Sequence, residues 1–192
     1  LCWMLAGLLA AGGAYASDDI QALLDKAEHT KSADHQRFQR LLEELNLSLE
    51  QATPRQQDAI RYLNAYALVF QGKHEQAIRD AQDLLNTAID PDVRFRASAL
   101  IVNAYAINRK FTDGLRQLER TLTLLSSVSS KELRHQGWGV AATINSQIGQ
   151  HEEALQFADK ILVDEPDART ECLARQVYLD AQQNLSKTEP RE

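Results

Sequence analysis

A seven-residue pattern that occurs three times constrains this chain more than any other feature of its sequence. Residues 72–78 and 149–155 share a glycine, a histidine, a glutamate and an alanine at the same places, and residues 109–115 align between them. The small residues that align are Ala77, Gly114 and Ala154, at steps of 37 and 40 residues. An internal period between about 20 and 50 residues is typical of solenoids, in which one supersecondary unit is stacked repeatedly.

Apolar residues between these patterns recur at intervals of three and four, and no window alternates as a strand does. The chain has only 8 Gly and 4 Pro in 192 residues, too few turn formers for a sandwich or barrel. We therefore predict an all-α fold of antiparallel helix hairpins. The predicted helices cover residues 18–30, 34–50, 54–71, 74–88, 91–108, 111–126, 130–148, 151–163 and 167–184.

Start signals support these helices. Thr53 and Gln56 flank Pro54 in the arrangement of a capping box, and Asp90 precedes a proline in the same way. Ser129 with Glu132 predicts a further box, and the acidic stretch 164–167 suits the N-terminus of the last helix.

The first sixteen residues differ from the rest of the chain. Leu1 to Ala16 is uncharged and apolar and ends in Ala14-Tyr15-Ala16, the small-x-small pattern that signal peptidase recognises. We expect a signal peptide whose start is truncated, cleaved after Ala16, which places the mature protein in the periplasm. An uncleaved anchor and a buried N-terminal helix are the alternatives. Cleavage would leave Cys172 as the one cysteine, so no internal disulfide is expected.

The third pattern resembles a tetratricopeptide repeat. Trp138 lies sixteen residues before Ala154 and Ala142 lies twelve before it, as the motif prefers, and Pro166 stands at the closing proline. The earlier copies are degenerate, with Arg61 and Ser98 in the tryptophan position. The resemblance implies a superhelical solenoid, with structural positions at Ala65, Gly72, Ala77, Gly114, Trp138, Ala142, Gly149, Ala154 and Pro166.

This resemblance also implies a domain organisation. A helical hairpin would occupy residues 17–53, and three degenerate repeats with a following helix would occupy residues 54–185. Residues 186–192 would form a tail or the start of a continuation.

In tetratricopeptide arrays the first helix of each hairpin lines a concave groove. The resemblance assigns a ligand groove to Tyr62, Tyr66, Arg96, Asn103, Thr143 and Gln147. An arginine in such a groove suits a carboxylate, and an asparagine can bond a peptide backbone. The Lys–Asn clamp of chaperone-binding members is not reproduced. The alternative for these residues is structural, with Tyr66 in the core and Asn103 capping a neighbouring carbonyl.

A narrower resemblance rests on residues 92–97, 103–107 and 137–142. These segments are similar to the exported repeat region of GGDEF-type diguanylate cyclases, which precedes a transmembrane helix and a cytoplasmic GGDEF domain. The resemblance implies a periplasmic sensory module for a protein, a peptide or a small molecule. A stand-alone periplasmic scaffold or adaptor is the alternative.

Other classes of function have little support in the sequence. The net charge of −6 and pI near 5.4 argue against a nucleic-acid partner. The five histidines show no metal-ligand spacing, and Ile78 and Leu155 stand where a zincin motif needs its second histidine. The serines near residue 128 lack a glycine elbow. We expect no catalytic residue, metal or cofactor in this segment.

Overall fold

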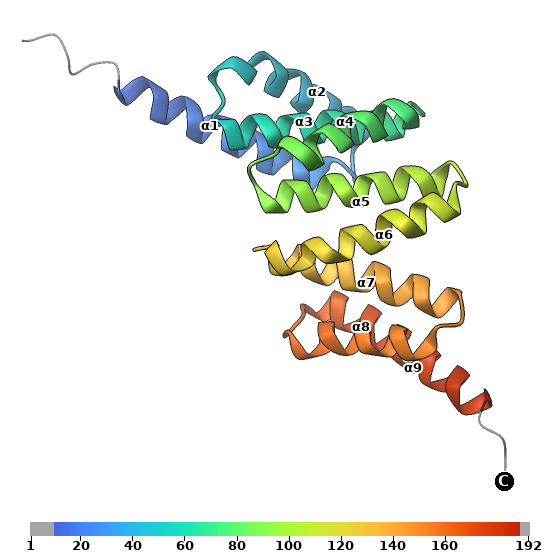
Figure 1. Cartoon of the computed structure of the whole chain (residues 1–192). Coiled ribbons are helices and arrows are strands. Elements are labelled where there is room, and N and C mark those ends of the chain that lie inside the picture. The colour runs from blue at the N-terminus through green and yellow to red at the C-terminus, as the bar shows by residue number, and fades with distance from the viewer. Residues whose placement is uncertain (1–9, 189–192) are drawn as a thin grey trace, which may run out of the picture. The chain divides into compact units, whose positions relative to one another are not determined.

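The computed structural model describes residues 10–188 of the chain, and within this range every regular element is a helix (Figure 1). The predicted all-α class is confirmed for these residues. The α-helices are α1 (Ala10–Thr30), α2 (His35–Leu47), α3 (Pro54–Phe70), α4 (His74–Thr87), α5 (Pro91–Ile107), α6 (Phe111–Leu124), α7 (Lys131–Gln147), α8 (His151–Val163) and α9 (Ala168–Thr188). Two 3₁₀ turns, η1 (Leu49–Gln51) and η2 (Leu125–Ser127), follow α2 and α6.

Helix ends differ from the predicted ones by two residues or more in four places, one of which is the end of α9, at Thr188 rather than at residue 184. Helix α1 begins at Ala10 rather than near residue 18, because the alanines between residues 10 and 16 also favour helix. The predicted helices 34–50 and 111–126 each end earlier, and their last turns are the tighter η1 and η2.

The capping residues predicted for α3 and α5 are confirmed, and the one predicted for α7 is corrected. Thr53 and Gln56 form a complete capping box on α3, and the Asp90 side chain accepts from the backbone of Asp92. The N-cap of α7 is Ser130 rather than the predicted Ser129, since the Ser130 hydroxyl accepts from the backbone N–H of Leu133.

The chain divides into two compact units, Leu1–Gly114 and Leu115–Glu192, which we describe separately. In the first unit α3 is central and packs against α1, α2, α4 and α5. Its core contains fully buried Phe38, Leu45, Ile60, Leu63, Leu84 and Ile101.

In the second unit, α8 packs against both α7 and α9, and α7 also contacts α9. Alanines dominate these contacts, which lets the helix backbones approach closely. Those almost completely buried are Ala141, Ala142, Ala154, Ala158, Ala174 and Ala181.

The three aligned patterns form the same turn. Gly72, Arg109 and Gly149 each adopt a left-handed conformation, with φ of 73°, 57° and 83°. In each turn this residue donates a backbone hydrogen bond to the carbonyl three residues back. The next residue donates to the carbonyl five residues back, at 2.8–2.9 Å. This pair of bonds is the Schellman motif, which satisfies the last carbonyls of α3, α5 and α7.

The residues assigned to repeat-structural positions fall mainly in contacts between helices. Ala65, Ala77, Ala142 and Ala154 are at most 1% exposed. A Cβ on Gly114 would lie 3.6 Å from the Cβ of Tyr105, an ordinary contact, so alanine would also fit there. Trp138 and Pro166 are half-buried.

None of the described helices is both long enough and apolar enough to cross a membrane. Of the predicted signal peptide, residues 1–16, the first nine lie outside the described range and residues 10–16 belong to α1.

Candidate functional site

Three aromatic side chains form a row along one face of α3. Tyr62, Tyr66 and Phe70 follow one another at four-residue spacing, which brings them onto one side of the helix. Ring centroids are 6.4 Å apart for Tyr62 and Tyr66 and 5.0 Å apart for Tyr66 and Phe70. Tyr62 is buried, Tyr66 is half-buried and Phe70 is 58% exposed, so the row extends from the core to the surface.

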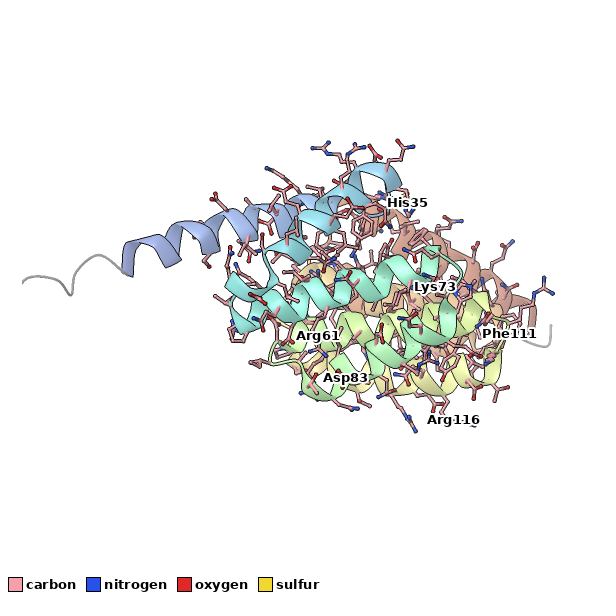
Figure 2. The ribbon with its side chains drawn as sticks, turned by 90° about the horizontal axis from the view of Figure 1, so that it is seen from above. His35, Arg61, Lys73, Asp83, Phe111 and Arg116 are labelled. Atoms are coloured by element: carbon pink, nitrogen blue, oxygen red, sulfur yellow. The ribbon has the colours of Figure 1, made fainter. Side chains whose placement is uncertain are left out.

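Helix α2 supports the outer end of this row. Phe38, which is fully buried, meets Tyr66 edge to face at a centroid distance of 5.9 Å. The ring of His35, which is the first residue of α2 and is labelled in Figure 2, has its centroid 6.1 Å from that of the Phe70 ring. The Tyr66 ring is therefore held by Phe38 of α2 and by its two neighbours in the row on α3.

A lysine from the end of α1 covers the inner two rings. The Nζ of Lys31 lies 5.0 Å from the centroids of both Tyr62 and Tyr66, which is within cation–π range. The same ammonium donates to the Tyr62 hydroxyl at 3.3 Å and forms an ion pair with Glu28, one turn earlier.

An arginine from α5 completes the site. The guanidinium carbon of Arg96 lies 6.0 Å from the Tyr62 ring centroid, and the Arg96 Nη1 forms an ion pair with the Glu28 Oε1 at 2.7 Å. The Arg96 Nε is buried and has no hydrogen-bond partner. Glu28 is thus held between two cations, with one carboxylate oxygen on each.

We call Glu28, Lys31, Tyr62, Tyr66 and Arg96 the cation–tyrosine cluster. It joins α1, α3 and α5, all within the first unit. Burial raises the pKa of Tyr62 well above its ordinary value, and nearby Glu28 raises it further, while Arg96 opposes this. Burial likewise raises the pKa of Tyr66, against the effect of Lys31. Both phenols are therefore neutral at physiological pH and present aromatic faces and hydroxyl groups, not nucleophiles.

The structure places the predicted groove residues in two groups. It brings Tyr62, Tyr66 and Arg96 together, and Asn103 lies exposed farther along α5. Thr143 and Gln147 belong to the second unit and are both exposed on α7. The Thr143 hydroxyl donates to the carbonyl of Gly139, one turn earlier, at 2.9 Å.

Sequence reasoning missed Glu28 and Lys31, although Arg96 was expected to meet a carboxylate. The carboxylate in the structure comes from the chain itself. The only signal was an acid and a base three residues apart at the end of the predicted helix 18–30, a spacing that is common on solvated helix faces.

An ion pair on the adjacent part of α3 offers a comparison. Arg61 bonds to Asp58 on its own helix and to Asp83 on α4, and Figure 2 labels the Arg61 and Asp83 side chains. This arginine has two carboxylate partners and belongs to no aromatic row, so it serves below as a control.

The described residues contain no group of three or more His, Cys, Asp or Glu side chains placed to hold a metal ion. His74 and His151 begin α4 and α8, and the Nδ1 atoms of both are buried without a hydrogen-bond partner. His135 is buried, and its Nε2 lies 3.0 Å from the Oδ2 of Asp164. No protein-family model, curated protein or solved structure matches this chain.

Proposed function

We propose that this chain is a periplasmic binding module of the tetratricopeptide type and forms the N-terminal sensory part of a membrane-bound GGDEF diguanylate cyclase. It recognises a protein, a peptide or a small molecule through the first helices of its hairpins. The segment itself performs no catalysis.

The observation that carries the binding role is the cation–tyrosine cluster. Arginine and tyrosine dominate the energy of recognition sites, because they combine a large contact area with directional hydrogen bonds. Here the side chains of Tyr62, Tyr66 and Arg96 converge from α3 and α5, and the exposed Phe70 extends the same surface.

Two features support the tetratricopeptide geometry. The three Schellman turns give equivalent exits from the first helices of successive hairpins, at steps of 37 and 40 residues. Ala77 and Ala154, equivalent residues of the following helices, are fully buried.

Export agrees with a contact made by the residue that follows the expected cleavage site. The backbone carbonyl of Ser17, the first residue after the expected cleavage site, accepts from the Gln56 side chain at 2.8 Å. Gln56 is also a member of the α3 capping box. Removal of residues 1–16 would leave this contact intact.

The binding role can be tested by site-specific photo-crosslinking in the exported protein. A crosslinking amino acid at Asn103, which is exposed on α5, should capture a partner, and Arg96→Ala should reduce the yield. The same probe at His74 or His151 serves as a control and should give no capture. Capture from these turn positions alone, independent of Arg96, would assign binding to another surface.

The reading frame beyond Glu192 distinguishes the two versions of the proposal. A transmembrane helix followed by a GGDEF domain would establish the sensory module. A stop codon would favour the alternative, a stand-alone periplasmic scaffold that uses the same surface for assembly.

A further inference from the structure

The cation–tyrosine cluster contains a carboxylate and an ammonium in direct contact, both supplied by one turn of the chain at the end of α1. The Glu28 carboxylate forms an ion pair with Arg96 at 2.7 Å, and the Lys31 ammonium lies over two tyrosine rings at 5.0 Å. The two groups also form an ion pair with each other. A free α-amino acid carries the same two charges in the same close relation.

We propose that the face formed by Tyr62, Tyr66 and Arg96 binds the zwitterionic head of a free α-amino acid, and that Glu28 and Lys31 occupy this site when no ligand is bound. The inference rests on the proposed binding function of this face and names its ligand class.

Arg96 has the donors for a ligand carboxylate. A guanidinium offers five N–H groups in a planar fork and binds carboxylates through two parallel bonds. In the structure the Glu28 carboxylate forms an ion pair with Nη1, while the Nε is buried without a hydrogen-bond partner. A small carboxylate that is not tethered to α1 is free to take the two-bond arrangement that Glu28 does not make.

The tyrosines provide the complementary site for a ligand ammonium. A cation within about 6 Å of a ring centroid is attracted by the ring face, more strongly where water is excluded. Lys31 meets this condition for both rings and bonds to the Tyr62 hydroxyl. Because burial keeps that hydroxyl neutral, it can accept this bond without adding a charge.

The arrangement couples binding to α1. A ligand must displace Glu28 and Lys31, whose charged groups then return to water. These side chains hold the end of α1 against α3 and α5, so ligand binding would weaken the attachment of that helix. Competition by an internal ligand also lowers the apparent affinity, because only the fraction of molecules with a vacant site binds.

The test uses the side-chain Nε–H resonance of Arg96 in the ¹⁵N NMR spectrum of the intact exported protein, titrated with glycine. Glycine should give a saturable shift of this resonance. Glycinamide lacks the carboxylate and N-acetylglycine lacks the ammonium. Each should bind at least about tenfold more weakly than glycine, since each loses one charge-assisted contact. The Arg61 resonance is the internal control and should not move.

A double variant tests the competition. Glu28→Ala with Lys31→Ala should bind glycine about tenfold more tightly than the wild type, because the internal ligand is removed. The matched control, Asp58→Ala with Asp83→Ala, removes the carboxylates of Arg61 and should leave glycine binding unchanged.

Three outcomes would overturn the inference. The first is no saturable shift with wild-type protein, which requires no variant to fold. The second is equal binding of glycine and its two blocked forms. The third is a double variant that binds glycine no more tightly than the wild type, which would show that Glu28 and Lys31 do not compete for the site. Crosslinking at Asn103 that depends on Arg96 would in each case still support the proposed function.

Discussion

The Nη1 of Arg96 and the Oε1 of Glu28 form an ion pair at 2.7 Å, which joins α5 to α1 beside Tyr62 of α3. The side chains are 30% and 26% exposed, so water screens the pair only in part. The same contact therefore has two consequences. It attaches α1 to the rest of the first unit, and it places a carboxylate of the chain itself in the cation–tyrosine cluster.

A double-mutant cycle measures the first of these consequences. Glu28→Ala, Arg96→Ala and the double variant should show a coupling free energy of about 1 kcal/mol, between the values for an exposed pair and for a buried charge-assisted bond. The coupling should decrease in high salt. Urea unfolding of the four proteins gives the value, and a coupling near zero would mean that the contact contributes nothing to stability.

Ala154 provides a test of close packing in the second unit. It is fully buried on α8, so Ala154→Leu should overpack the site and lower the free energy of unfolding by about 1–3 kcal/mol. Gln156→Leu, two residues on and exposed, is the control and should have little effect. Thermal unfolding compares them, and an unchanged melting temperature for Ala154→Leu would contradict the assigned register.

Arg109 predicts a stabilising substitution. It adopts φ of 57° at the position occupied by Gly72 and Gly149 in the equivalent turns. A left-handed conformation costs a non-glycine residue about 1–2 kcal/mol, and the greater freedom of glycine in the unfolded chain offsets part of that. Arg109→Gly should therefore raise the free energy of unfolding by about 0.5–1 kcal/mol. Gly72→Ala, the reverse change in an equivalent turn, should lower it.

The acid stability of the second unit should depend on Asp164. Burial raises its pKa, but bonds from His135 and Arg134 outweigh that effect and hold the pKa below its ordinary value of 3.8. A carboxyl whose pKa is lower in the folded state stabilises the fold above the unfolded pKa, and this contribution is lost as the pH falls through the folded value.

The variant Asp164→Asn should therefore be less stable than the wild type at neutral pH. The difference in melting temperature should remain constant down to about pH 5 and disappear in stronger acid. Asp159→Asn, at an exposed residue of α8, is the control. A difference that persists unchanged in acid would show that packing, not charge, accounts for the loss.

Local signals predicted more of this molecule than long-range ones did. Helices and their starts followed from apolar spacing and caps, since the Thr53–Gln56 box needs only residues close in sequence. Tyr62 and Tyr66 were placed on one face for the same reason. The bond between Glu28 and Arg96 joins helices distant in sequence, and nothing in either residue's surroundings specifies the other. The left-handed conformation of Arg109 was missed, because an arginine rarely adopts it. The equivalent residues of the other two turns are glycines, which adopt it readily.

The last prediction concerns processing at the N-terminus. If signal peptidase cleaves after Ala16, the mature protein begins at Ser17, whose carbonyl and hydroxyl both accept from the Gln56 side chain at 2.8 and 3.4 Å. A protein that begins at Ser17 should therefore unfold at the same temperature as the uncleaved chain. Gln56→Ala should destabilise both forms by about 1 kcal/mol, because it removes the capping box and the contact with Ser17. N-terminal sequencing of the exported protein checks the cleavage site itself. Periplasmic protein that still carries Leu1 to Ala16 would contradict cleavage and favour an N-terminal anchor.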